Sequence, residues 1–249
     1  MIDREVFGGV MGKVLEFFNR LRQLATGAPR QTALLSMAAF AALGPVIFMG
    51  FNISAQLLHP KDNPIAVTVS FLVFGSYGWL QTSAFYILGI SLLALAAAIF
   101  LKTHKKKLNL GAIVVFLTGV AFLLVASNHV QNVGTVITTS EIVHRDAAIA
   151  IVVMSPLACF FMAANLKKRG HKGLWIYSIC AGGVALLTIA VGFLIPIAHS
   201  NFLGIFERIL LLNGQVWGEI ICLNLIWTTF RIKRIAVHGF PTKLTLLRS

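Results

Sequence analysis

Acidic residues are scarce in this sequence. Only eight of the 249 residues are Asp or Glu, and charged residues of both signs make up 12% of the chain. A soluble domain carries about 25% charged residues and presents them to water. This chain therefore cannot build a water-facing surface of the usual kind, which excludes a soluble globular domain and a charge-rich disordered chain.

Cysteine is also rare, and the spacings that mark well-known catalytic and metal sites are missing. The three cysteines, Cys159, Cys180 and Cys222, lie within apolar stretches and form no CxxC pair, so they read as small core residues and exclude a disulfide-rich secreted domain. The sequence contains no HExxH, HxxxH or GxSxG motif. No metal and no cofactor is predicted, and a haem protein is a weak alternative.

Apolar residues, by contrast, make up 57% of the chain, and the mean hydropathy is +0.85. A membrane-spanning helix needs about 20 mostly apolar residues. The sequence predicts an all-α, polytopic membrane bundle of six transmembrane helices. The six stretches are Leu34–Leu58, Trp79–Leu101, Leu110–Ser127, Ala147–Leu166, Leu174–Ala198 and Ile209–Phe230.

The formal net charge of +13 reports orientation rather than nucleic-acid binding. Of the 21 Lys and Arg residues, 18 lie in residues 1–30, in the loops 102–107 and 167–172, and in the tail 231–249; the others are Lys61, Arg145 and Arg208. Basic residues stay on the cytoplasmic side of a membrane, so both termini are predicted to be cytoplasmic. A seventh span cut from Ile65–Leu101 would place the later basic segments outside and is rejected.

Three regions are predicted along the chain. Residues 1–30 are expected to form an amphipathic helix on the cytoplasmic face, because Phe7, Val10, Val14, Phe17 and Leu21 recur at helical spacing. Its basic face would lie on anionic lipid, or the helix packs on a partner protein. Residues 31–230 form the six-helix transmembrane domain, and residues 231–249 form a basic cytoplasmic tail.

Two local patterns concern packing. The stretch Pro64–Tyr77 is apolar but too short to span, and a short interfacial helix, a strand or a re-entrant piece all remain open; we expect it to cover the outer end of the bundle. Gly214 and Gly218 form a GxxxG pattern in the last span, which predicts a closely packed helix face.

The candidate site residues are the polar groups at the outer end and in the last span. His59, His129 and His199 bring a histidine to each of three outer loops, although polar loops at helix ends are ordinary. Arg208 is expected to bind an anion bidentately or to tie a loop carboxylate such as Asp62 or Asp146. Glu219 lies in mid-membrane, where a carboxylate is either functional or hydrogen-bonded to a neighbouring helix. The full candidate cluster is Asp62, His144, Asp146, Glu207, Arg208, Gln215 and Glu219.

Three segments together resemble the domain-of-unknown-function family 998, a family of prokaryotic integral membrane proteins. The resemblance covers about residues 33–230 and implies a compact six-helix bundle; it implies no reaction, because the family has none assigned. The matching segments are His59–Pro64 with Gly75–Gln81 and the following Ala84, Phe85 and Gly89; Val143–Ile151; and Gly204–Ile209 with Trp217.

Binding of a lipid, a small hydrophobic ligand or a protein partner at the extracytoplasmic end is the function expected first. The alternatives are a membrane-embedded lipid-modifying hydrolase with a His/Asp site and a proton-coupled transporter that uses Glu219 and Arg208. Expected partners are membrane lipids, with anionic head groups at the cytoplasmic face, and the chain is a candidate subunit of a larger membrane complex; nucleic acid is excluded. The expected location is the cell membrane, either a plasma membrane or a bacterial inner membrane.

Overall fold

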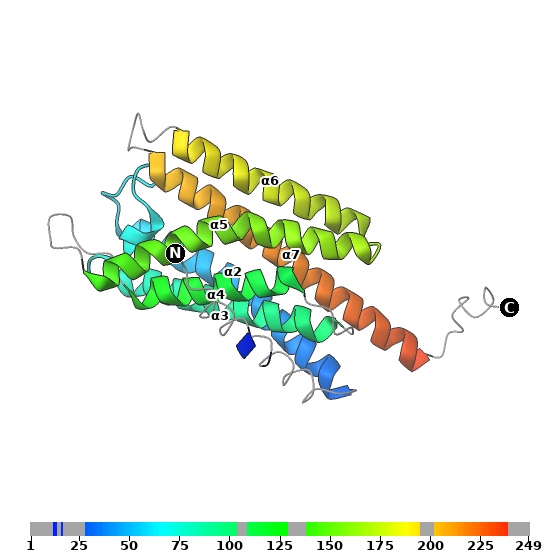
Figure 1. Ribbon diagram of the computed structural model, residues 1–249. Helices are drawn as coiled ribbons and strands as arrows, with labels where there is room; N and C mark the ends of the chain where they lie inside the picture. The colour runs from blue at the N-terminus through cyan, green and yellow to red at the C-terminus, as the bar shows by residue number, and fades with distance from the viewer. Residues whose placement is uncertain are drawn as a thin grey trace.

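In the computed structural model of this protein, the structure describes residues 12, 13, 16, 28–103, 109–128, 138–194 and 202–238. These residues form six long α-helices and one short 3-10 helix, with no strand among them (Figure 1). The helices are α2 (Ala28–Leu58), α3 (Gly78–Lys102), α4 (Leu110–Ser127), α5 (Thr139–Lys168), α6 (Lys172–Leu194) and α7 (Leu203–His238), and the 3-10 helix is η1 (Val69–Val73).

All six long helices are long and apolar enough to cross a membrane, which confirms the predicted number of spans. They leave large apolar side chains on the outside of the bundle. Leu57 is 73% exposed and Trp227 is 70% exposed. A protein in water rarely presents so many such side chains together, and lipid accommodates them at no cost. The six helices therefore indicate a multi-pass membrane protein.

Three of the helices extend well beyond the predicted spans. Helix α2 begins at Ala28, α5 at Thr139 and α7 at Leu203, and α7 continues to His238. The apolar stretch of a sequence marks only the part of the helix that crosses the lipid. The helical hydrogen bonding of the backbone continues through polar residues on either side of that stretch. Helix α6 is described as far as Leu194, so its predicted end at Ala198 lies outside the described residues.

The N-terminal region is described at three positions only. Gly12, Lys13 and Glu16 are helical and exposed, and the other residues of the predicted amphipathic helix before Ala28 lie outside the described part of the chain. The division at residues 30 and 231 therefore stays a prediction.

The helices run antiparallel in chain order, so the bundle has two distinct ends (Figure 1). We call the end that carries residues 59–77 the loop end; α3, α5 and α7 begin there. We call the opposite end, where α3 and α5 finish and α4 and α6 begin, the basic end, because it carries the loops 102–109 and 169–171. Helix α2 starts and α7 finishes at the basic end.

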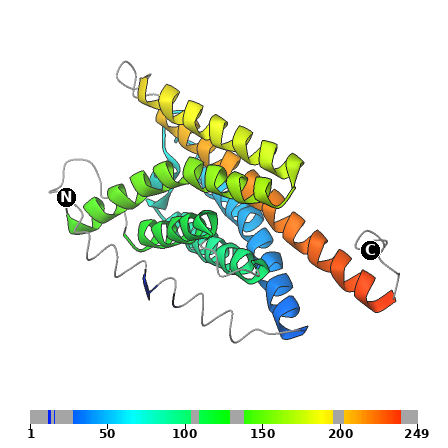
Figure 2. The same cartoon turned by 45° about the vertical axis from the view of Figure 1, so that its right-hand side comes forward.

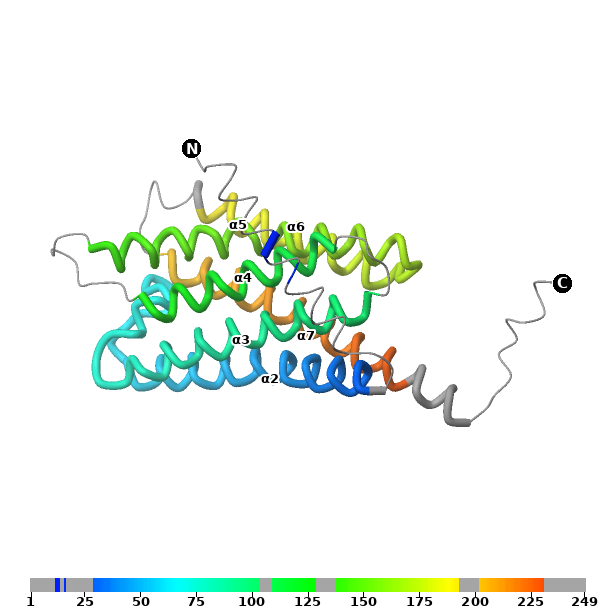
Figure 3. The backbone as a smooth tube through the Cα atoms, turned by 60° about the horizontal axis from the view of Figure 1, so that its bottom comes forward, coloured from blue at the N-terminus to red at the C-terminus, as the bar shows by residue number. Residues whose placement is uncertain are grey.

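Sequential packing builds the core, and α7 closes it. Helix α2 lies along α3, α3 along α4, and α4 along α5, and α7 returns to pack on α2 (Figure 3). Fully buried side chains in this core include Phe48 from α2, Leu95 from α3, Ile113 from α4 and Cys159 from α5. Small residues such as Ala96 and Ala98 let the helices approach closely, as membrane helices require.

Helix α5 packs on α4 along the bundle but separates from α6 toward the loop end. It is joined to α6 by a tight turn at Arg169–His171, but the two helices diverge toward the loop end in both Figure 1 and Figure 2. Helix α6 packs on both α5 and α7, whereas α5 touches α7 at few points. The bundle is thus open on one side, between α5 and the α6–α7 pair.

Helices α3 and α4 approach each other closely, whereas the GxxxG pattern of α7 makes no such close approach. A Cβ added to Gly119 would lie 2.9 Å from the carbonyl oxygen of Gly89 and 3.1 Å from the backbone nitrogen of Leu93. In contrast, a Cβ on Gly214 or Gly218 would meet only side-chain atoms, at 3.5 and 3.9 Å, which is ordinary contact. The prediction of close packing at Gly214 and Gly218 is wrong, because those glycines face a cavity.

Replacing Gly119 with alanine should therefore destabilise the bundle. The new methyl group meets backbone atoms that cannot move aside, so we expect a loss of about 1–3 kcal/mol. Gly183→Ala is the control, because a Cβ there meets nothing within 4 Å; it should be neutral or slightly stabilising. Thermal unfolding of both variants in detergent checks this, and equal midpoints would contradict the close α3–α4 contact.

Candidate functional site

The segment between α2 and α3 is irregular backbone, held in place by side chains. The His59 ring contacts the carbonyl oxygen of Ala55 through Nδ1 at 2.8 Å and that of Phe74 through Nε2 at 2.9 Å. Gly75 follows with a φ of +80°, a conformation that favours glycine. The segment contains the 3-10 helix η1 rather than a strand, which resolves one alternative left open by the sequence.

Arg208 ties this loop to the first turn of α7. Its Nη1 donates to the carbonyl oxygens of Pro64 and Val67, both at 2.7 Å, and its Nη2 donates to Oε1 of Gln56 at 2.7 Å. Gln56 in turn donates from Nε2 to the backbone carbonyl of Asp62 at 2.9 Å. Arg208 therefore reaches the loop through backbone carbonyls and an amide, and not through the carboxylate of Asp62 or Asp146.

Glu207, the neighbour of Arg208, holds the next part of the loop. Its carboxylate accepts from the backbone N–H of Val69 at 2.5 Å and from the hydroxyl of Ser70 at 3.5 Å. Gly204 allows the close approach, because a Cβ there would lie 2.3 Å from the carbonyl oxygen of Val67. Residues 204, 207 and 208 thus act together, and they are the residues of the Gly204–Ile209 segment that the sequence singled out.

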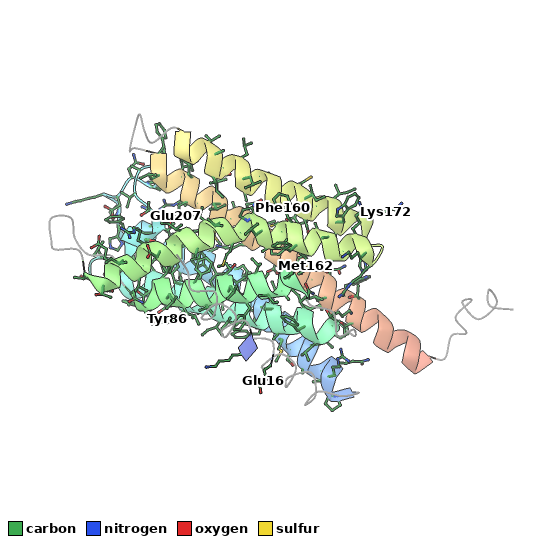
Figure 4. All side chains as sticks on the ribbon, in the orientation of Figure 1. Glu16, Tyr86, Phe160, Met162, Lys172 and Glu207 are labelled. Carbon is green, nitrogen blue, oxygen red and sulfur yellow. The ribbon has the colours of Figure 1, made fainter. Side chains whose placement is uncertain are left out.

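A groove of about 1130 Å³ opens between α5 and the α6–α7 pair. This volume lies just above the range for small-molecule sites, roughly 300–1,000 Å³. Its walls are almost entirely apolar: Val152, Leu157 and Phe160 come from α5, and Ile189 and Leu210 come from α6 and α7. Figure 4 labels Phe160 on α5 and Glu207 at the start of α7, two residues of this lining.

The polar lining of the groove is concentrated at the loop end. Glu141, His144 and Arg145 from the start of α5 and Glu207 from the start of α7 all line the groove there. His144 is buried, and its Nδ1 contacts the carbonyl oxygen of Asn128 at 2.6 Å. A carbonyl only accepts, so Nδ1 donates this hydrogen bond, which makes Nε2 an acceptor whenever the ring carries a single proton. Arg145 pairs with Asp146 at 3.2 Å on the exposed surface.

A smaller cavity of about 70 Å³ lies deeper in the bundle and adjoins the groove. Ile151, Leu210 and Leu211 line both spaces. Gln215 lines this cavity and is 6% exposed, and both atoms of its amide group lack a hydrogen-bond partner among the described residues. One carboxylate oxygen of Glu219, one turn further along α7, is buried without a partner in the same sense.

The structure does not bring the seven candidate residues into one cluster. His144 and Glu207 line the groove, Gln215 lines the deeper cavity, and Arg208 secures the loop beside the groove. Asp62 contributes its backbone carbonyl to the loop, and Asp146 faces outward with Arg145. His129 and His199 lie outside the described residues, and within the described part of the chain no three His, Cys, Asp or Glu side chains gather closely enough to hold a metal ion.

Sequence reasoning missed the groove and two residues that shape the site. Gln56 looked like an ordinary helix-end residue, although it joins Arg208 to the loop. Pro156 lies within α5 and lines the groove, and its residue type could have indicated a change in the course of this helix. Proline cannot donate to the carbonyl of Val152, so it favours a bend at that point.

Comparison with known proteins agrees with this architecture. The family model described as "Protein of unknown function (DUF998)" matches residues 42–224, which is more than half of the chain. The chain belongs to the DUF998 family. No curated protein and no solved structure matches it. The match confirms the resemblance drawn from the sequence, and it covers α3 to α6, with η1 and most of α2 and α7, including the groove of this DUF998 member.

Replacing Arg208 with lysine should release the loop from α7. Lysine keeps the charge but lacks the planar fork that reaches three acceptors at once. We expect amide hydrogen exchange in residues 64–73 to become roughly tenfold faster or more, a change of about 1.4 kcal/mol per factor of ten.

Arg145→Lys is the matched control, because the Arg145–Asp146 pair has side chains that are 62% exposed. Such a pair contributes about 0–1 kcal/mol, so exchange in the same residues should not change. Equal exchange in wild type and Arg208→Lys would show that the guanidinium does not anchor the loop.

Proposed function

We propose that this DUF998 member binds a membrane lipid, or an apolar molecule of similar shape, in the groove between α5 and the α6–α7 pair. The observation that carries the proposal is the groove itself: about 1130 Å³, lined by apolar side chains, with its titratable groups at one end only. That distribution matches a molecule with a long apolar part and one polar end.

Apolar walls alone would also accept the bulk lipid that surrounds any membrane protein. The polar groups at the loop end of the groove are therefore what would distinguish a specific ligand from bulk lipid. There the ligand's polar end meets the acceptor Nε2 of His144 and the exposed guanidinium of Arg145, beside the hydroxyl-bearing Thr68 and Ser70 of the anchored loop. A head group carrying both a hydroxyl and an anionic oxygen would satisfy these groups, with the hydroxyl donating to His144.

The orientation of the chain decides which leaflet the ligand would come from. The loops of the basic end and the two terminal regions hold 18 of the 21 Lys and Arg residues. Basic residues stay on the cytoplasmic side of a membrane, so the basic end would be cytoplasmic and the loop end would lie outside. The groove would then open to the outer leaflet. The membrane concerned is then the plasma membrane or the bacterial inner membrane.

Two alternatives use some of the same residues. A hydrolase built on His144 and Asp146 would need both side chains to leave their present partners, the carbonyl of Asn128 and Arg145. A proton-coupled transporter would use Glu219, which lies on α7 beyond the groove and has one buried oxygen without a partner among the described residues. Lipid binding accounts for the groove without rearrangement, so we prefer it to both.

Filling the groove tests the proposal. Gly192 lines the groove from α6, and a Cβ there meets Phe206 at an ordinary 3.5 Å, so Gly192→Trp should fold with its ring in the groove. The protein is reconstituted in phosphatidylcholine vesicles that contain a photoreactive analogue with a diazirine in its acyl chain. In wild type we expect cross-links concentrated on the groove faces of α5 and α6, and a loss of most of them in Gly192→Trp.

Gly183→Trp is the matched control on the same helix, because Gly183 is exposed and has open space around it. It adds the same side chain outside the groove and should leave the cross-links unchanged. Cross-links spread evenly around the bundle, or an equal yield from both variants, would argue that the groove holds no lipid of its own.

A further inference from the structure

A third pocket, of about 50 Å³, lies at the basic end, away from the groove. It is enclosed by the last turns of α3 and α5, the start of α4 and the α7 residues that face them. Met162, labelled in Figure 4, forms part of its wall. The polar side chains that line it are Lys102, Asn109, Asn165, Arg169, His171, Asn224 and Thr228, and none of the lining residues is a carboxylate.

Lys102 turns its ammonium group into the bundle rather than out along the surface. Its Nζ donates to the hydroxyl oxygens of Thr228 and Thr229 on α7, both at 3.0 Å. Each of these hydroxyls donates its own proton to a carbonyl of α7. Each hydroxyl oxygen is therefore the acceptor of the hydrogen bond from the ammonium group. An ammonium group has three protons, and the third has no acceptor among the described residues.

Arg169 approaches the same pocket from the end of α5. Its Nη2 donates to the hydroxyl of Thr103 at 3.0 Å, next to Lys102 in the chain. A guanidinium has five N–H donors in a planar fork, and Arg169 is exposed, so most of this fork remains open at the mouth. The pocket wall between them is fixed by Asn165, which donates to Oδ1 of Asn109 at 2.8 Å.

Two cations therefore converge at a pocket that no carboxylate lines. There is no Asp or Glu between Asp62 and Glu141, or between Asp146 and Glu207. In the part of the chain that the structure describes, neither Lys102 nor Arg169 is paired with a carboxylate. Like charges at one pocket repel each other, and an anion between them removes that cost.

We propose that this pocket binds a phosphate group. The donors come from three directions: the ammonium of Lys102, the fork of Arg169 and the amide of Asn224. A phosphate presents three or more oxygens to such a set, whereas a carboxylate presents two. The phosphate can belong to the head group of an anionic lipid at this face of the membrane or to a soluble phosphate compound, and both share the chemistry that the pocket recognises.

The test compares Arg169→Gln with Lys168→Gln in the purified full chain. Lys168 precedes Arg169, is exposed, and does not line the pocket, so the control removes the same charge one residue away. In one arm, inorganic phosphate is titrated calorimetrically at constant ionic strength in uncharged detergent. In the other, native mass spectrometry measures retention of phosphatidic acid against phosphatidylcholine. Lys102→Gln is a second pocket variant, with thermal unfolding as the check that each protein is folded.

We expect Arg169→Gln to weaken binding tenfold or more and Lys168→Gln to change it less than twofold. Retention of phosphatidic acid without binding of inorganic phosphate assigns the site to a lipid head group, and binding of inorganic phosphate assigns it to a soluble compound. No binding in either arm, or equal weakening by Arg169→Gln and Lys168→Gln, would overturn the proposal.

Discussion

The hydrogen bonds of Arg208 are the interaction on which the loop end depends. Residues 59–77 are not a regular helix, and irregular backbone beside a membrane must have its carbonyls satisfied by protein. The guanidinium of Arg208 donates hydrogen bonds to two of those carbonyls and to the side chain of Gln56. The carboxylate of the adjacent Glu207 accepts a hydrogen bond from the backbone N–H of Val69. Gly204 lets the two backbones meet closely enough for this to happen. The first turn of α7 therefore positions the whole loop.

The anchored loop gives the groove its polar end. Thr68, Ser70 and Phe71 line the groove because the loop is held against α7, and α5 diverges from α6 toward the loop end on the other side. A closed six-helix bundle would bury these faces against one another. The open side of this one leaves apolar faces of α5 and α6 for another molecule, and lipid is the apolar molecule that surrounds a membrane protein.

Helix number and family were predictable from the sequence because they depend on long apolar runs and on short ordered motifs. The importance of Glu207 and Arg208 was predictable too, since charged residues at the start of a membrane helix need partners. Their actual partners were not, because the backbone carbonyls of Pro64 and Val67 carry no signal in residue type. The groove could not be predicted either: apolar residues that face lipid, protein or an open groove look alike, and only Pro156 hinted that α5 diverges from its neighbours at one end.

The two ends of the molecule thus differ in chemistry as well as in charge. Apolar walls and a few paired polar groups mark the loop end, whereas at the basic end Lys102 and Arg169 line a pocket that no carboxylate lines. The most direct measurement of the central claim is a cryo-electron microscopy map of the full chain in lipid nanodiscs. Lipid binding in the groove predicts elongated density between α5 and the α6–α7 pair, with its wider end beside His144 and Glu207. A map in which α5 closes on α6 and α7 along its whole length would contradict it.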